Sequence, residues 1–169
     1  MARVATNQSI VLQAVVDRLI GEIPEFSNST CFLTTVPPDE PPANIRDNLF
    51  ATVSPTNGRF REDVHEGAGI FGTFEEAGVM VTVFSSIRLD RIGHDSNLMM
   101  DTARGLFAIK HKIIKALSGH DLLDTAGNQI LTNYMAPLTS DRPQSSRDAK
   151  TAAGDLSLVF STDFEWDLT

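Results

Sequence analysis

A glycine pattern, G-x-G-x-x-G at residues 67–72, is the feature of this sequence most similar to a cofactor site. Dinucleotide binding needs a strand before these glycines and a helix after them, so that the pyrophosphate meets the helix N-terminus. Here polar residues precede the pattern, and the residues that follow it lead into a predicted strand. The glycines therefore predict a loop, and we expect no cofactor to bind there.

Imidazole and carboxylate groups, the usual ligands of many metal ions, are neighbours at three places in the chain. The pairs are His65-Glu66, His94-Asp95 and His120-Asp121. Adjacent side chains point in different directions on a helix and on a strand, so adjacency builds no metal site. The four histidines, at positions 65, 94, 111 and 120, never show the spacing of four that faces one way along a helix. We expect surface histidines and no metal ligand.

A catalytic nucleophile is not indicated either. The single cysteine, Cys31, stands in an apolar stretch with Phe32 and Leu33, where burial raises the pKa of a thiol. No G-x-S-x-G turn is present to hold a reactive serine. Neighbouring carboxylates such as those of Glu75 and Glu76 are typical of a charged outer face. We therefore expect no catalytic residue and no enzymatic activity.

The charge balance of the chain limits its partners. With 14 basic and 22 acidic residues, the net charge of −8 repels phosphate backbones and disfavours dedicated nucleic-acid binding. The 41% of hydrophobic residues are typical of a soluble globular domain, and no apolar run approaches the roughly 18 residues of a membrane span. We expect a soluble protein, made inside the cell, with no membrane partner.

Hydrophobic periodicity predicts the elements that position these residues. Apolar residues recur at helical spacing in two segments and alternate with polar ones in others. The expected elements are helix 8–23, strand 48–54, strand 77–90, helix 97–118, strand 129–138 and strand 156–168, with residues 31–33 as a possible short strand. In the second helix the expected buried stripe includes Met99, Met100, Ala103, Leu106, Phe107, Lys110, Ile113, Ile114 and Leu117.

Three polar or irregular segments separate these elements: a proline-rich arm (35–48), a glycine-rich loop (58–76) and a polar loop (139–154). The predicted fold is a single α+β domain over residues 1–169, in the order α-β-β-α-β-β. It contains one antiparallel or mixed sheet of about four strands, with two amphipathic helices packed on one face. Strands 48–54 and 77–90 form a hairpin with the glycine-rich loop at its tip.

The last strand has the clearest pattern in the chain. Apolar and aromatic residues occupy its even positions, and its odd positions become acidic towards the end. We predict that Phe160, Phe164 and Trp166 are buried against the two helices.

Four stretches of the chain together resemble the tail-terminator (tail-completion) proteins of long-tailed bacteriophages. They are a helix end at 19–24 (LIGEIP), a strand at 79–85 (VMVTVFS), a helix end at 113–119 (IIKALSG) and the closing strand at 156–166 (LSLVFSTDFEW). The resemblance implies a structural virion protein that forms a hexameric ring, caps the tail tube, stops its growth and joins the tail to the head. It also implies contacts with the tail tube protein and with a head-completion or connector protein.

In that role the protein is found in the neck region of the virion, and in the host cytoplasm during assembly. DNA passes through the ring without sequence-specific binding, and an acidic protein suits this passage. We expect the acids of the last strand to meet arginines of the hairpin in the next subunit, and the glycine-rich loop to be a contact element. The candidate interface residues are Arg59, Arg61, Gly67, Gly69, Gly72, Arg88, Arg91, Asp163, Glu165 and Asp167.

Two other classes of function fit the same residues. One is another head–tail connector component, such as a head-completion protein. The other is a small ligand-binding α+β domain, or an enzyme, that uses the loop at 58–76.

Overall fold

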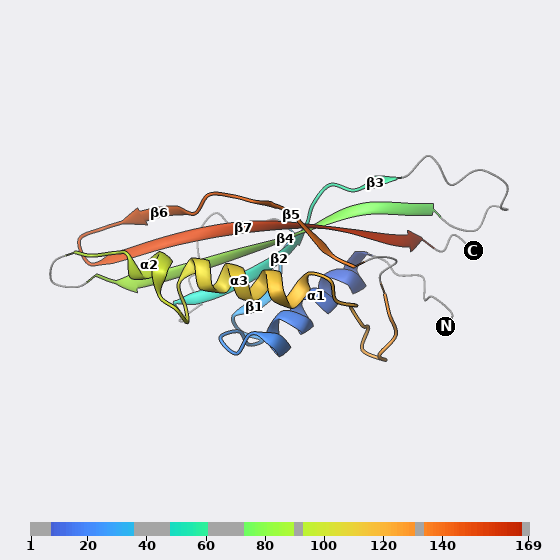
Figure 1. The fold of residues 1–169 in the computed structure, drawn as a ribbon, viewed down its shortest axis with the longest axis horizontal. Coiled ribbons are helices and arrows are strands. Elements are labelled where there is room, and N and C mark those ends of the chain that lie inside the picture. Colours follow the sequence, from blue (N-terminus) through green and yellow to red (C-terminus); the bar gives the residue numbers. More distant parts are fainter. Residues whose placement is uncertain (1–7, 36–47, 61–72, 90–92, 131–133, 167–169) are drawn as a thin grey trace.

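The computed structural model describes residues 8–35, 48–60, 73–89, 93–130 and 134–166, with the backbone alone at residues 60, 73–75 and 163–166. These residues form an α+β fold with one sheet of seven strands. Three helices, α1 (Gln8–Glu22), α2 (Asn97–Met100) and α3 (Leu106–Leu117), lie on the same side of the sheet (Figure 1). The predicted fold class and the helices on one face are confirmed.

Two long antiparallel strands form the centre of the sheet. β4 (Thr73–Arg88) and β7 (Thr151–Trp166) pair along their whole length, from Thr73 opposite Trp166 to Arg88 opposite Thr151. β2 (Leu49–Pro55) is antiparallel to β4, which confirms the predicted pairing of these two segments, and β1 (Cys31–Leu33) is parallel to β2. The sheet is therefore mixed. The loop predicted between β2 and β4 at 58–76 is wrong at both ends, because Arg59–Phe60 forms a strand and β4 already begins at Thr73.

Short strands complete the sheet. β5 (Ala136–Ser140) and β6 (Gln144–Arg147) both pair with β7, and β3 (Arg59–Phe60) pairs with β4. The order across the sheet is β1-β2-β4-β7-β5, so β1 and β5 lie at opposite edges.

The core lies between the sheet and the helices because the two long strands alternate in register. Val79 pairs with Phe160, Val81 with Leu158 and Val83 with Leu156, and all six side chains are buried. On the helix side they join a cluster that includes Val15 and Leu19 of α1 and Ile109 and Ile113 of α3. In the strands every second residue is apolar, and in the helices that pack on them the apolar residues recur every 3.6 positions. These two patterns are visible in the sequence, which explains why the main elements were predictable.

The opposite face of the sheet also has buried side chains. The rings of Phe50 and Phe84 stack with their centroids 4.6 Å apart, and Phe32 stacks on Phe50 at 6.4 Å. Thr82 and Ser157 share a hydroxyl hydrogen bond of 2.9 Å. Accordingly β2 is buried on both faces along most of its length.

The predicted strand count and order were wrong at the sheet edges. The polar loop expected at 139–154 contains the end of β5, all of β6 and the start of β7, joined by two short connections. Likewise the strand expected at 129–138 is β5, which begins at Ala136, although Gln129 forms an isolated bridge with Leu123. All side chains of β5 and β6 are exposed, so these strands have no buried face and no apolar alternation in the sequence.

The predicted helix at 97–118 is interrupted between α2 and α3. Asp101 Oδ1 accepts hydrogen bonds from the N–H groups of Ala103 (2.9 Å) and Arg104 (2.6 Å), which closes a turn. Gly105 packs against this turn: a Cβ atom there would lie 2.6 Å from the carbonyl oxygen of Asp101. The break changes the helical phase, so Met100, Ala103 and Phe107 are exposed instead of lying in the predicted buried stripe.

Phe160 provides a direct test of this core. Its side chain is 0% exposed, so Phe160→Ala should lower the free energy of unfolding by about 3–5 kcal/mol. Met100→Ala is the control, since Met100 is 66% exposed and its loss should change stability by less than about 0.5 kcal/mol. Urea unfolding followed by circular dichroism measures both. A loss below about 1 kcal/mol for Phe160→Ala would contradict the assigned face of β7.

Candidate interaction surfaces

One end of the central ribbon extends past the helix layer (Figure 1). It consists of β3 and the adjoining ends of β4 and β7. Backbone register places Arg59 opposite Glu76 and Glu76 opposite Asp163, so three charged residues occupy one row across three strands. Ser161 Oγ donates a 3.2 Å hydrogen bond to Glu76 Oε1. Two predicted interface residues, Arg59 and Asp163, are thus near each other within one subunit.

Arg88 lies at the other end of β4. At about 3.3 Å per residue, the strand separates it from Glu76, and hence from Arg59, by roughly 40 Å. It borders a recess of about 300 Å³ lined by Asn48, Ser85, Ser86, Ile87, Arg88, Asn97, Asp101 and Arg104. The arginines expected to act together along the hairpin therefore belong to two separate surfaces.

Several predicted residues lie outside the described part of the chain. These are Arg61, Gly67, Gly69, Gly72, Arg91 and Asp167, most of the proline-rich arm, and the side chains of Asp163, Phe164, Glu165 and Trp166. The strand β4 begins at Thr73, directly after the glycine pattern. A strand therefore occupies the place where a dinucleotide site would need a helix N-terminus.

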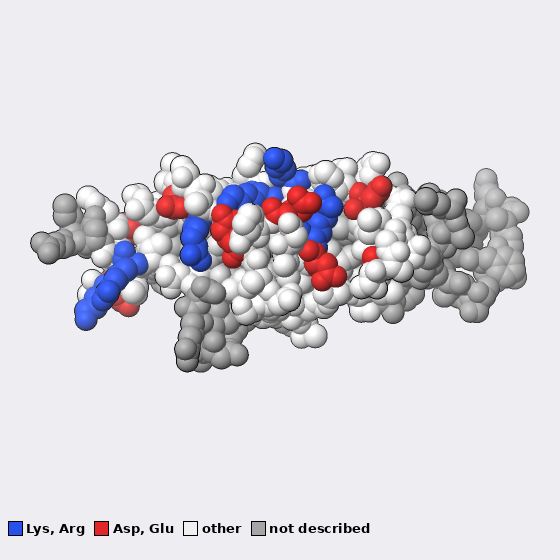
Figure 2. All heavy atoms as spheres, turned by 90° about the horizontal axis from the view of Figure 1, so that it is seen from below, with Lys and Arg blue, Asp and Glu red and all other residues white. Residues whose placement is uncertain are grey.

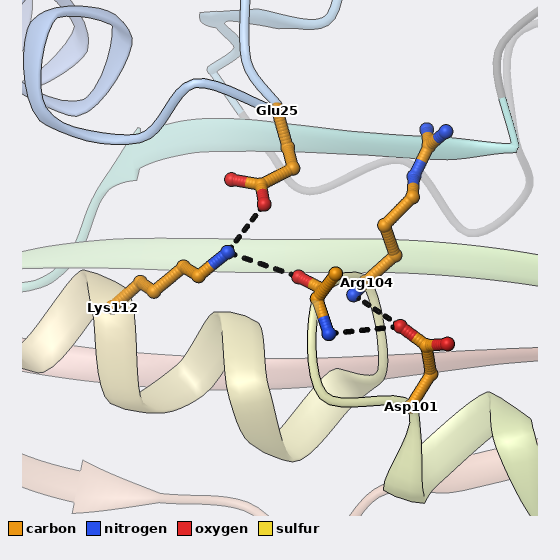
Figure 3. Close-up of polar contacts among 5 residues, drawn as sticks. Glu25, Asp101, Arg104 and Lys112 are labelled. Carbon is orange, nitrogen blue, oxygen red and sulfur yellow. Dashed lines mark hydrogen bonds and ion pairs between the residues drawn. The ribbon is translucent and has the colours of Figure 1, made fainter.

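A polar network that the sequence did not indicate joins the α1–β1 connection to α3 (Figure 3). Lys112 Nζ donates to a carboxylate oxygen of Glu25 and, at 3.0 Å, to the carbonyl oxygen of Ala103. Partial burial of Glu25 opposes ionisation, but the hydrogen bond from Lys112 and the nearby charge of Arg104 hold the pKa of Glu25 below its ordinary value. Because Glu25 and Lys112 are 87 positions apart, no local pattern reveals the pair.

The single cysteine is inaccessible. Cys31 is 1% exposed, and burial, with a smaller contribution from the charge of Asp17, raises the pKa of its thiol to about 12. This confirms the predicted effect of burial on the thiol. The predicted surface positions of His94, His111 and His120 are also confirmed, whereas His65 lies outside the described residues. Within the described ranges no group of three or more potential metal-ligating side chains comes together.

A groove of about 460 Å³ runs beside the N-terminal half of α1. Its described lining residues are Ser9, Ile10, Gln13, Ala14, Asp17, Leu33, Leu123, Asp124 and Thr125. Ile10, Leu33 and Leu123 are large apolar side chains that remain exposed. The charged groups of this lining are the two carboxylates of Asp17 and Asp124. We call it the acidic groove.

A second exposed apolar strip lies at the other sheet edge, where α3 and β5 run side by side. Lys110 Nζ donates to Ser140 Oγ at 2.6 Å, and the N–H of Gly119 donates to the carbonyl of Met135 at 3.3 Å. Two large apolar side chains are exposed along this line, at Phe107 (46%) and Leu138 (65%). We call it the α3–β5 seam, comprising Phe107, Lys110, Ile114, Leu138 and Ser140. Sequence reasoning missed it because it placed Phe107 in the core.

Comparison with known proteins found a similar fold among solved structures. No family model matches the chain, and no curated protein matches it. The fold is similar to that of a chain in the solved structure described as "Virion of native gene transfer agent (GTA) particle", with a TM-score of 0.53 and 18% sequence identity. The similarity covers 94% of this chain and 99% of that chain, so the likeness in fold extends over nearly all of both. None of the described helices is long and apolar enough to cross a membrane.

The Glu25–Lys112 pair predicts a pH-dependent contribution to stability. Because the pKa of Glu25 is lowered in the folded protein, the contribution is present above the unfolded pKa and is lost as the pH falls through the folded pKa. Glu25→Gln should therefore cost about 1 kcal/mol at pH 7 and less at pH 3, in urea unfolding at both pH values.

Glu22→Gln is the matched control for this experiment, since Glu22 is exposed and its contact with Arg18 is long, at 3.8 Å. It should change stability by less than about 0.5 kcal/mol at either pH. An equal loss for Glu25→Gln at pH 7 and pH 3 would show that the carboxylate charge contributes nothing.

Proposed function

We propose that this chain is a structural virion protein of a phage-like particle and acts as a tail terminator. In this role it forms a ring, caps the tail tube, stops its growth and joins the tail to the head. The observation that carries the proposal is the similarity in fold, over 94% of this chain, to a chain of a gene transfer agent virion. Large apolar side chains that remain exposed, among them Ile10, Leu33, Phe107, Leu123 and Leu138, give this chain surfaces for contact with other proteins.

A non-enzymatic role agrees with the chemistry of the described residues. The thiol of Cys31 is buried and stays protonated at neutral pH, and the described histidines are exposed. The polar groups that do come together, such as those of Asp101 and of Glu25 with Lys112, hold a turn and a loop in place. These contacts therefore stabilise the fold.

The proposed partners are further copies of the chain, the tail tube protein and a head-completion protein. The end of the β3–β4–β7 ribbon extends past the helix layer (Figure 1), and we assign it as a contact surface for a neighbouring protein. A net charge of −8 suits a ring through which DNA passes, because an acidic lumen does not retain phosphates. In the virion the protein then occupies the neck, between tail and head.

Deleting the gene for this chain from the element that encodes the particle tests the proposal. The expected result is filled heads without attached tails, together with tail tubes of uncontrolled length, in electron micrographs of the lysate. If the terminator both stops tube growth and joins the tail to the head, the two defects should appear together. The wild-type gene, supplied separately, should correct both. The Met100→Ala gene, altered at an exposed position outside the groove and the seam, should correct them equally.

Other outcomes of the deletion distinguish the competing roles. Tails of normal length with heads that leak DNA would assign the chain to head completion. Intact, normal particles would contradict a structural role of either kind.

A further inference from the structure

The two exposed apolar surfaces lie at opposite edges of the sheet and carry opposite charge. We propose that the acidic groove of one subunit binds the α3–β5 seam of the next, so that identical head-to-tail contacts build the ring. This inference rests on the self-association included in the proposed function and names the surfaces that produce it.

The acidic groove has the composition of a docking site. Three exposed apolar side chains, Ile10, Leu33 and Leu123, come from α1, from β1 and from the α3–β5 connection. Carboxylates accompany them: Asp17 Oδ1 accepts a 2.8 Å hydrogen bond from Gln13, and Asp124 accepts the N–H groups of Ala126 and Asn128. Hydrogen bonds from Asn128 lower the pKa of Asp124, so this carboxylate is charged at neutral pH.

The seam presents the complementary surface. Phe107, Lys110 and Ile114 follow the i, i+3, i+7 spacing that places side chains along one flank of a helix. The contact between Lys110 and Ser140 shows that this flank faces β5, where Leu138 is exposed. The seam thus offers apolar side chains and one ammonium group to a groove that offers apolar side chains and carboxylates.

Because the acidic groove and the α3–β5 seam lie at opposite edges of the sheet, their contact leads to a ring or a filament and not to a symmetric dimer. A contact between unlike surfaces is heterologous, and it closes into a ring when its rotation divides a full turn evenly. Backbone pairing between edge strands is disfavoured at β5, because Pro137 has no N–H and a bulge interrupts the strand beside it. We therefore expect side-chain contacts to hold the subunits together.

The acidic subunits can approach one another because their charges are mixed. On the helix-bearing face, acidic and basic side chains lie close together, so repulsion between like charges of two subunits is locally reduced (Figure 2).

Site-directed crosslinking of the full-length protein tests this contact. Leu123→Cys places a thiol in the groove, Leu138→Cys places one in the seam, and the native Cys31 is buried and stays unreactive. A short bismaleimide added to an equimolar mixture of the two variants should give covalent dimers. Each variant alone should give no covalent dimer, although it still self-associates, because a head-to-tail contact never brings two identical positions together. Met100→Cys matches Leu138→Cys in exposure, at 66% and 65%, and should not crosslink to Leu123→Cys.

Charge reversal in the same mixture tests the complementarity. Asp17→Lys in the groove variant, or Lys110→Asp in the seam variant, should lower the dimer yield about tenfold, and combining the two should restore much of it. Dimers from a single variant alone would overturn the proposal in favour of a symmetric contact. The absence of dimers at millimolar protein would overturn it in favour of a different occupant of the groove. Either failure, beside a positive deletion phenotype, would leave the virion role standing and remove only this interface.

Discussion

The antiparallel pairing of β4 with β7 is the constraint on which the other elements depend. Sixteen consecutive residue pairs hold these strands together, and every other strand except β1 pairs with one of them. The helices cover only part of this ribbon, where valines of β4 face Leu156, Leu158 and Phe160. Past the end of the helices the pairing of β4 with β7 continues, but it carries charged residues such as Glu76. We infer that this end of the ribbon is stabilised by the part that the helices cover.

The constraint explains which elements the sequence predicted. Alternation was clear in β4 and β7 because helices bury one face of each strand, and α1 was predicted to within a residue at its end. At the edges, β5 and β6 have fully exposed side chains, so no hydrophobic signal marks them. The break before α3 depends on how closely Gly105 packs on the backbone of Asp101, which periodicity does not encode. One misplaced turn of helix was enough to assign Phe107 to the core.

Site prediction failed for a related reason. The sequence places Arg59 and Arg88 near two predicted strands, but the length of β4 puts them at opposite ends of the molecule. The acidic groove gathers Ile10, Leu33 and Leu123 from three distant segments, and the Glu25–Lys112 pair also joins distant segments. By contrast the inert environment of Cys31 was predictable, because its immediate neighbours are apolar. Local chemistry could be inferred from sequence, and long-range juxtaposition could not.

We propose that this chain forms a ring at the junction between the tail and the head of a phage-like particle. Cryo-electron microscopy of intact particles from the encoding element tests it most directly, because the long β4–β7 ribbon with helices on one side is recognisable in density. We expect one closed ring of this fold between the end of the tail tube and the head. Density for the fold repeated along the tube, or the absence of such density from the particles, would contradict a terminator role.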